Sequence, residues 1–264
     1  MKQYIVDVFT DRVFSGNQAA VCVLENWLSD DLMQNIAKEN NFSETAFAVK
    51  SGEKYLLRWF TPNGEIDFCG HATLGAAYVI NRFYDTNHET IIFDTSYGNL
   101  TLTVTGGMVN MKTRAYPLNE IDITSDMIKA IGVTPRAAYK ARDIMLVLES
   151  QYEVENLKVD SQLLKKLDGV SVAVTAKGDK YDCVSRVFAP QLDVIEDPVT
   201  GSTHCMIAPY WAKVLNKNQL IAYQASKRGG IIYAQVDGNT VNIAGRVVLY
   251  SVAEILSDLK NLDI

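Results

Sequence analysis

Cysteine, histidine and proline are scarce in this 264-residue sequence, which contains four, three and six of them respectively. The cysteines (Cys22, Cys69, Cys183 and Cys205) lack the paired spacing of a disulfide framework or a zinc site. With so few histidines as well, we expect no metal centre. Scattered single cysteines are typical of a protein kept in a reducing cytoplasm.

Long apolar runs and basic clusters are also missing. No run of about 18 uncharged apolar residues occurs, and an acidic residue, Asp7, lies in the first strand-like segment, so we expect neither a membrane span nor a signal peptide. A net charge of -6, without a Lys/Arg block among aromatics, argues against a nucleic-acid partner. The remaining composition, 48% hydrophobic and 21% charged, is that of an ordinary globular protein.

Two common enzyme motifs are absent. There is no Gly-x-Gly-x-x-Gly for a dinucleotide and no Gly-x-Ser-x-Gly for a nucleophilic serine, since Gly201-Ser202-Thr203 lacks a second flanking glycine. The sequence therefore predicts no nicotinamide or flavin cofactor and no serine triad.

Two glycine turns that lead into helices are present. Residues 68–75 pass from a strand end into a helix through Gly70, and residues 197–204 do the same through Gly201. The first amides of such a helix attract a carboxylate or phosphate, and His71 is placed to donate a hydrogen bond or a proton there. We expect both helix starts to face a shared cleft.

Hydrophobic periodicity predicts the elements around these turns. The predicted strands are residues 4–9, 19–24, 45–50 and 54–60, and the predicted helices are residues 30–40, 72–83, 205–215 and 253–262. The helix at 72–83 carries no charge before Arg82, so it should be buried nearly all round. The last helix could pack on either half of the chain.

The sequence also repeats itself. Arg58-Trp59-Phe60-Thr61-Pro62 is matched 128 positions later by Arg186-Val187-Phe188-Ala189-Pro190, and Gly70 and Gly201 are 131 positions apart. Gly98 and Gly230, 132 apart, each precede a Val-Asn pair at the same distance. We therefore predict two duplicated domains, 1–116 and 117–264, of the α+β class, each a sheet around a central helix with one further short helix.

Glu44 is the candidate acid/base. It begins a predicted strand between Phe42 and Phe47, where a carboxyl group is poorly solvated, and the matching position in the second half is Val170. The plain alternative is a solvated strand-end glutamate. For His71 the alternative is a structural histidine at a helix start, whose ring is hydrogen-bonded by backbone groups.

Asp197 is the candidate polar group of the second half. It follows Glu196 and precedes Pro198 and the Gly201 turn. The alternative is that both acidic residues belong to a solvated loop.

Five segments together resemble the phenazine-biosynthesis PhzF-like family of isomerases: residues 16–21, 42–45, 58–62, 69–74 and 197–202. The resemblance runs from about Val6 to Ala208. That family is similar in fold to diaminopimelate epimerase, which has two pseudo-symmetric domains and an active site between them. The resemblance implies the same architecture here.

The resemblance also implies roles for individual residues. Glu44 matches the catalytic acid/base, which moves a proton between carbons of a small unsaturated carboxylic acid without metal or organic cofactor. His71 and Asp197 match its supporting polar groups. The residues that would contact the substrate are Gly70, Gly201, Ser202 and, as a weaker candidate, Asn17. A homodimer is implied as well.

Two alternatives stay open. The chain could be a carboxylate-binding protein that keeps the cleft without turnover, or a racemase or epimerase with two bases. The second is disfavoured, because the related epimerases use two cysteines and Thr200 stands before Gly201 where Cys69 stands before Gly70. The identity of the substrate does not follow from the sequence.

Overall fold

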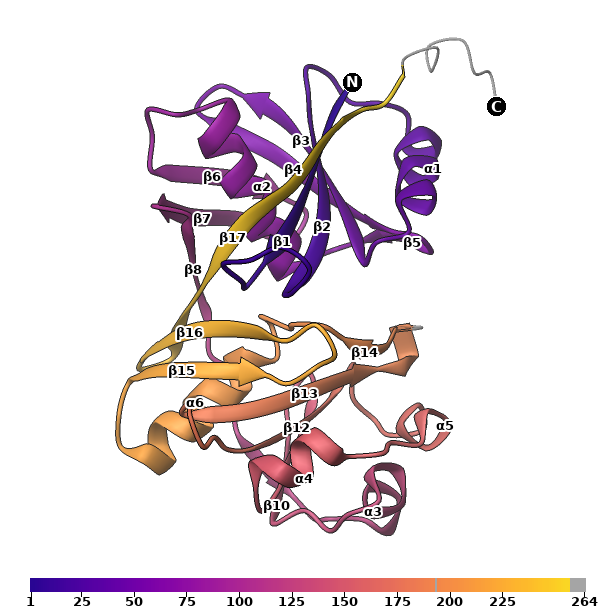
Figure 1. Cartoon of the computed structure of the whole chain (residues 1–264), viewed down its shortest axis with the longest axis vertical. Coiled ribbons are helices and arrows are strands. Elements are labelled where there is room, and N and C mark those ends of the chain that lie inside the picture. Colours follow the sequence, from indigo (N-terminus) through magenta and orange to yellow (C-terminus); the bar gives the residue numbers. More distant parts are fainter. Residues whose placement is uncertain (193, 257–264) are drawn as a thin grey trace. The chain divides into compact units, whose positions relative to one another are not determined.

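The computed structural model describes residues 1–192 and 194–256, which cluster into two compact units (Figure 1). Unit 1 comprises Met1–Phe14, Gln18–Met111 and the residues from Gly245 on, and unit 2 comprises Ser15–Asn17 and Lys112–Ala244. None of the helices in these described residues is long and apolar enough to cross a membrane.

The first half of the chain contains two helices among strands. Its elements are β1 (Lys2–Val8), β2 (Asn17–Leu24), α1 (Asp30–Asn40), β3 (Glu44–Ser51), β4 (Lys54–Thr61), β5 (Gly64–Ile66), α2 (Gly70–Phe83), β6 (Thr90–Thr95), β7 (Gly98–Thr105) and β8 (Met108–Arg114). The strands and helices predicted up to residue 83 are confirmed to within two residues at each end. Helix α1 begins as expected, because Ser29 Oγ accepts from the amide of Leu32.

The second half contains more helices than the sequence predicted. Its elements are β9 (Asn119–Ile121), α3 (Ser125–Ile131), β10 (Ala137–Lys140), β11 (Ile144–Val147), α4 (Gln151–Asn156), α5 (Ser161–Leu164), β12 (Val172–Lys177), β13 (Cys183–Ala189), the 3₁₀ turn η1 (Pro190–Leu192), β14 (Val194–Asp197), α6 (His204–Leu215), β15 (Gln219–Gln224), β16 (Gly230–Asp237) and β17 (Thr240–Glu254). The expectation of one short helix is wrong here, since α3, α4 and α5 share a single apolar core with strands β10 to β13.

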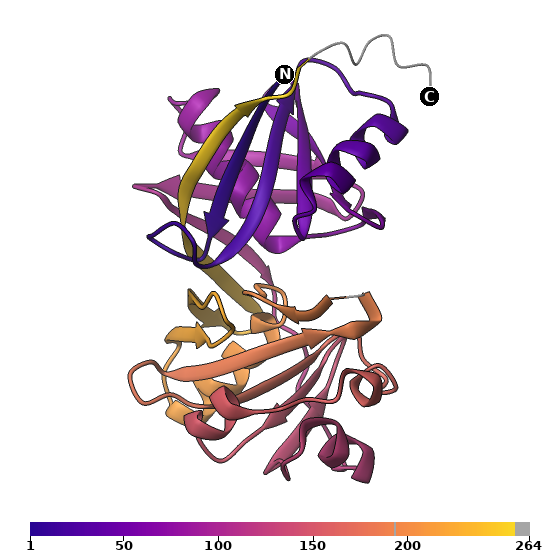
Figure 2. The same cartoon turned by 45° about the vertical axis from the view of Figure 1, so that its right-hand side comes forward.

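Helix α2 is the centre of unit 1. Residues 70–80 are all buried, as the uncharged sequence predicted, and the helix packs against β1, β3, β6 and β7 (Figure 2). The approach to β1 is close: a Cβ added at Gly75 would lie 2.9 Å from Val6 Cγ2. Each fully buried aliphatic side chain of α2, such as Leu74 or Ile80, contributes about 1.5–3 kcal/mol to folding.

Helix α6 holds the corresponding place in unit 2. It packs against β15 and β16, with residues 204–208 and Trp211 buried. The helix begins at His204, so Gly201 and Ser202 lie in the turn that precedes it and not in its first turn.

Strand pairing repeats between the halves. Strands β2 and β3 are parallel, as are β11 and β12, and each pair continues into an antiparallel partner, β4 and β13 respectively. Beyond that, β4 pairs in parallel with β6 and β13 with β15, and the antiparallel pairs β6–β7 and β15–β16 follow. The repeat found in the sequence thus recurs in the strand pairing, and each unit is a strand-rich, barrel-like α+β fold around a helix.

The repeated Arg-x-Phe sequence has a structural explanation. Arg58 on β4 donates through Nε and Nη2 to the Glu65 carboxylate on β5, both at 2.6 Å. Arg186 on β13 donates in the same way to Glu196 on β14, at 2.7 and 2.9 Å. In each strand the guanidinium also lies 5.1 Å from the aromatic ring two residues on. We call these two groups the arginine clamps.

Strand β17 extends through the region predicted as the last helix. Its residues Val247–Glu254 pair with β1, including Ala253 opposite Gln3 and Glu254 opposite Lys2. The helix prediction is therefore wrong at Ala253 and Glu254, because pairing with a strand from the opposite end of the chain overrides local periodicity. The predicted helix residues 257–262 lie outside the described residues.

Candidate functional site

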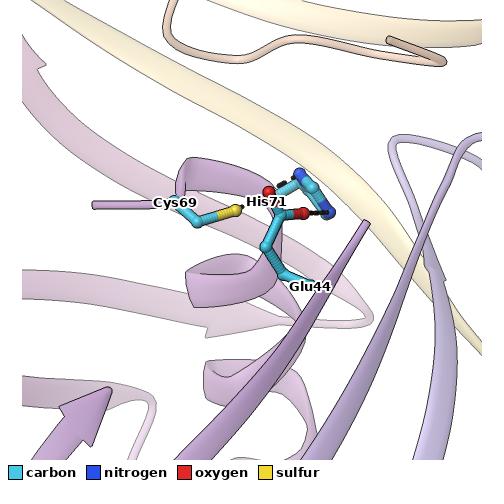
Figure 3. A group of neighbouring side chains, drawn as sticks. All are labelled: Glu44, Cys69 and His71. Atoms are coloured by element: carbon cyan, nitrogen blue, oxygen red, sulfur yellow. Dashed lines mark hydrogen bonds and ion pairs between the residues drawn. The ribbon is translucent and has the colours of Figure 1, made fainter. Parts of the chain in front are cut away.

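Glu44 and His71 form a largely buried pair in unit 1. Glu44 is the first residue of β3 and His71 the second residue of α2, so a strand start and a helix start bring them together (Figure 3). Glu44 Oε2 lies 3.0 Å from His71 Nε2, and the side chains are 16% and 7% exposed. A carboxyl group with limited access to water beside a second proton-carrying group is suited to proton transfer.

Cys69, directly before α2, lies on the other side of the ring. Its Sγ is 3.5 Å from His71 Nδ1, and on the opposite nitrogen the Gln18 carbonyl oxygen lies 3.2 Å from Nε2. Burial, and then the charge of Glu44, raise the pKa of the Cys69 thiol to about 11. The thiol is therefore protonated at neutral pH.

The charge of His71 is set by its neighbours. Burial lowers the pKa of His71, but Cys69 and Glu44 outweigh burial and raise this pKa well above 6.5. A proton on the ring is thus favoured, and an imidazolium stabilises a negative charge on Glu44.

The start of α2 favours a bound anion. The side chain of the N-cap residue Cys69 makes no capping hydrogen bond, so the first-turn amides need another acceptor. Gly70, the first helical residue, presents no Cβ there, and a Cβ would have only Met111 Cε nearby, at 3.9 Å. A ligand carboxylate is an acceptor of suitable charge for these amides.

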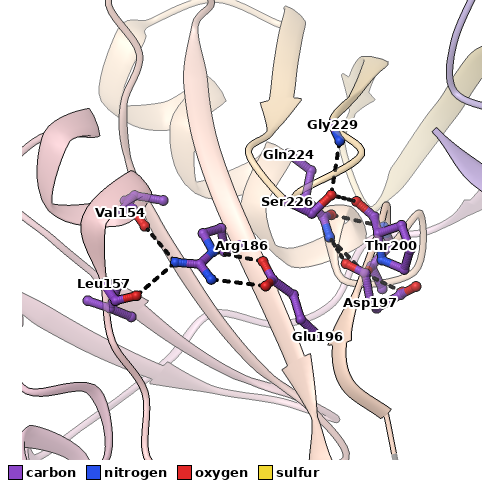
Figure 4. Close-up of polar contacts among 10 residues, drawn as sticks. Val154, Leu157, Arg186, Glu196, Asp197, Thr200, Gln224, Ser226 and Gly229 are labelled. Carbon is purple, nitrogen blue, oxygen red and sulfur yellow. Dashed lines mark hydrogen bonds and ion pairs between the residues drawn. The ribbon is translucent and has the colours of Figure 1, made fainter. Parts of the chain in front are cut away.

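Asp197 is the centre of a polar group in unit 2. Its Oδ1 accepts a 2.8 Å hydrogen bond from Asn17 Nδ2. Its Oδ2 accepts from the Thr200 hydroxyl (Figure 4). Asn17 is fully buried and also donates to the Val199 carbonyl at 3.0 Å. Asp197 is thus a fixed acceptor and not part of a solvated loop.

Gln224, which the sequence did not single out, holds the segment from Asp197 to Thr200 in place. Its Nε2 donates to the Asp197 carbonyl at 2.7 Å, and its Oε1 accepts from the Thr200 amide at 2.9 Å. Ser226 adds a 2.6 Å bond to the Pro198 carbonyl. No sequence signal marks Gln224, since a single glutamine in a strand is common and its partners are 24 and 27 residues away.

Ser202 contacts a cation that the sequence also did not indicate. Arg142 Nη2 donates to Ser202 Oγ at 3.1 Å, while Arg142 Nε donates to the buried Asp143 at 3.1 Å. Thr203 Oγ1 donates to the same aspartate at 3.2 Å. The turn before α6 therefore carries a positively charged side chain beside its hydroxyl group.

The remaining candidates have structural roles. Glu196 belongs to an arginine clamp, and His88 is 71% exposed beside Asp85. His204 is fully buried, with Nδ1 2.8 Å from the Thr200 carbonyl, and burial lowers its pKa to about 4, so it is neutral.

One group of side chains has the composition of a metal site. The ligand atoms of Glu44, Cys69 and His71 all lie within 4.8 Å of one another. The thiol contacts one ring nitrogen and the carboxylate the other, so the imidazole stands between them. An ion bound to the lone pair of one ring nitrogen would lie away from the neighbour on the other side of the ring. The arrangement therefore fits an ion pair with a thiol contact better than a metal centre.

The predicted residues divide between the two units. Unit 1 contains Glu44, Gly70 and His71, and unit 2 contains Asn17, Asp197, Gly201 and Ser202.

Comparison with known proteins gives consistent results. The sequence profile of the PhzC-PhzF family, described as phenazine biosynthesis-like protein, matches residues 6–253. An uncharacterized isomerase of Pseudomonas aeruginosa is 44% identical over 251 residues, which are 95% of this chain and 96% of that protein. The crystal structure of a PhzF-family phenazine biosynthesis protein from Enterococcus faecalis superimposes with a TM-score of 0.94 at 46% identity, covering 97% of this chain and 98% of that one.

A more distant likeness bears on the fold alone. A probable proline racemase from Agrobacterium radiobacter has a TM-score of 0.66 at 8% identity and covers 99% of this chain and 94% of its own. The barrel-like arrangement is thus shared with epimerase-type folds.

Proposed function

The chain belongs to the phenazine biosynthesis-like protein family, and we propose that it is an isomerase that moves a proton within a small carboxylic acid, without metal or organic cofactor. Glu44 is the general acid/base. The observation that carries the proposal is the 3.0 Å contact between Glu44 and His71, in a buried setting at the start of α2.

The proposed reaction uses one carboxyl group twice. The Glu44 carboxylate takes a proton from one carbon of the substrate, and the electron pair delocalises towards the unsaturated acid. Glu44 then returns the proton to a second carbon on the same face. The imidazolium of His71 stabilises the carboxylate at the beginning and the end of this cycle.

Substrate binding is assigned to the helix starts. The amides after Gly70 and the turn at Gly201 and Ser202 hold the carboxylate of the substrate, and Arg142 adds a positive charge beside Ser202. Asp197, held by Asn17, orients the polar part of the substrate. The proposal requires that both groups act on one substrate in one cleft.

A second thiol base is not part of the proposal. Thr200 donates its hydroxyl to Asp197 and is far less acidic than a thiol, while Cys69 faces His71. We also propose that the protein works in the cytoplasm, where its four buried, unpaired cysteines stay reduced, and that it forms a homodimer, which light scattering would measure.

The test is a proton NMR assay in heavy water with a panel of small unsaturated acids and amino acids. We expect at least one compound to exchange or isomerise with the wild type, and Glu44→Gln to reduce that rate at least about 10²-fold, the usual range for a lost general base. Glu53→Gln is the matched control, because Glu53 is an exposed glutamate in the turn between β3 and β4. It should retain the wild-type rate.

Three results would contradict the proposal. A compound that binds but shows no exchange with the wild type would favour a carboxylate-binding protein. Exchange that survives Glu44→Gln would assign the proton transfer to another group. Deuterium entering a stereocentre with inversion would indicate an epimerase.

A further inference from the structure

His71 has a different partner at each ring nitrogen. Nε2 faces Glu44 from β3 at 3.0 Å and the Gln18 carbonyl of β2 at 3.2 Å, whereas Nδ1 faces the Cys69 thiol from the start of α2 at 3.5 Å. The titratable groups that these contacts bring to the ring are Glu44 and Cys69 (Figure 3). A Glu–His–Cys chain results, with the imidazole in the middle.

A thiol suits both charge states of the ring. When His71 is an imidazolium, its Nδ1–H donates to the sulfur, and when the ring is neutral with its proton on Nε2, the S–H donates to Nδ1. The distance of 3.5 Å is within the range of sulfur hydrogen bonds in either direction. A carboxylate could only accept a hydrogen bond, and a methyl group could do neither.

We propose that Cys69 is a positioning residue for His71. The Cys69 thiol contacts the ring in both protonation states and so keeps Nε2 directed at Glu44. This role rests on the proposed function, because the direction of Nε2 matters only if Glu44 takes up and returns a proton during turnover. It assigns a purpose to a buried cysteine that neither attacks the substrate nor transfers a proton to it.

Burial alone does not explain the side chain. Cys69 is 7% exposed, as a small apolar residue at this place would be, but alanine would fill most of that space without contacting Nδ1. The distinguishing feature is therefore the hydrogen bond. The test must measure the tautomer and protonation of the His71 ring rather than the stability of the protein.

The first measurement needs no substrate. The chain contains three histidines, so protein labelled with ¹⁵N in the imidazole rings gives three sets of ring signals whose shifts report tautomer and charge across a pH titration. In Cys69→Ala we expect the pKa of His71 to fall by about one unit. The variant loses a hydrogen bond to the charged ring, which disfavours the protonated form by about that pKa difference. In Cys69→Ser it should stay near the wild-type value, because a hydroxyl also donates and accepts.

Internal and external controls are available. The signals of exposed His88 and of buried, neutral His204 should not move in either variant. Cys183→Ala is the matched control, since Cys183 is a fully buried cysteine on β13 whose backbone pairs with β12 and β15. It should leave the His71 titration unchanged.

The second measurement is the exchange assay on the compound that the wild type turns over. Cys69→Ala should lower kcat roughly tenfold with KM little changed and shift the pH profile with the pKa of His71, and Cys69→Ser should restore most of the rate. Equal losses in both variants, or an unchanged His71 titration in Cys69→Ala, would overturn the positioning role. The titration does not depend on turnover, so it can succeed or fail separately from the isomerase proposal.

Discussion

The histidines in the first turns of the two central helices have opposite electrostatic environments. His71 in α2 faces a carboxyl group, and its pKa is raised well above 6.5, whereas His204 in α6 faces the Thr200 carbonyl and the Ser185 hydroxyl. Burial lowers the pKa of His204 to about 4. The two buried rings therefore have pKa values shifted in opposite directions.

This difference predicts how stability depends on pH. Since the folded-state pKa of His204 lies below its unfolded value near 6.5, the unfolded chain takes up the proton first as the pH falls. The contribution of neutral His204 is complete above about pH 6.5 and is lost as the pH falls towards 4, by an amount on the order of 3 kcal/mol. Urea unfolding measured at intervals between pH 8 and pH 4 gives the free energy of unfolding at each pH and so tests this loss.

Other groups titrate in the same range, so the comparison needs a variant. His204→Gln keeps a donor for the Thr200 carbonyl and cannot titrate. Its free energy of unfolding should vary less with pH than that of the wild type, whatever its absolute stability. Parallel curves for the two proteins would show that His204 is not the group responsible.

The sequence predicted residues with local signals and missed those fixed by distant contacts. Glu44 and His71 could be predicted, because one interrupts an apolar strand start and the other follows a glycine at a helix start, and the structure brings them together. Gln224 and Arg142 could not, because their importance comes from Thr200 and Ser202, which lie 24 and 60 residues away along the chain. Their residue types are common in any strand or loop.

Among the secondary-structure elements, the two arginine clamps provide an internal comparison. Arg186 is 15% exposed and Glu196 23%. Arg186 also donates to the Leu157 carbonyl at the end of α4 (Figure 4). Arg58 is 26% exposed and Glu65 42%. The same arginine–glutamate ion pair is thus less exposed to water in unit 2 than in unit 1.

Replacing each of these arginines with lysine should lower the free energy of unfolding by a different amount. A lysine keeps the charge but cannot make the two-pronged contact, so Arg186→Lys should lower the free energy of unfolding by about 2 kcal/mol. Arg58→Lys should cost less than about 1 kcal/mol, because water screens the more exposed pair. Urea denaturation of both variants measures the difference, and equal costs would show that burial does not decide the strength of a clamp.

The elements themselves were predictable except where pairing is non-local. The uncharged run of α2 and the Ser-Asp-Asp start of α1 are local signals and gave correct helices. Ala253 and Glu254 had helical periodicity but lie in a strand, since β1 supplies their hydrogen-bonding partners from some 250 residues away. The short helices of unit 2 were missed because four to seven residues carry little periodicity.

In the whole molecule, the two units differ in how the chain builds them. Nearly all of unit 2 is one continuous segment, Lys112–Ala244, whereas unit 1 needs residues from both ends of the chain. Strand β1 lies between β2 and β17, so the last described strand supplies one of its two neighbours.

Deleting residues 245–264 should therefore affect the units unequally. Without its β17 partner, β1 loses the hydrogen bonds that now run from Lys2 to Val8, and the core around α2 is exposed along that edge. Hydrogen exchange followed by mass spectrometry should show lost protection in β1, β2 and α2, with β12 and β13 much less affected. Full protection of β1 in the shortened chain would contradict this.

The same dependence has a consequence for biosynthesis. The ribosome makes the chain from the amino end, so β1 and β2 emerge before the main segment of unit 2. The part of β17 that pairs with β1 is made after that segment. Unit 2 receives its main segment earlier and can finish first. Unit 1 is thus started before unit 2 and completed after it. In the meantime β1 has an open strand edge on the nascent chain, which a chaperone would be expected to shield.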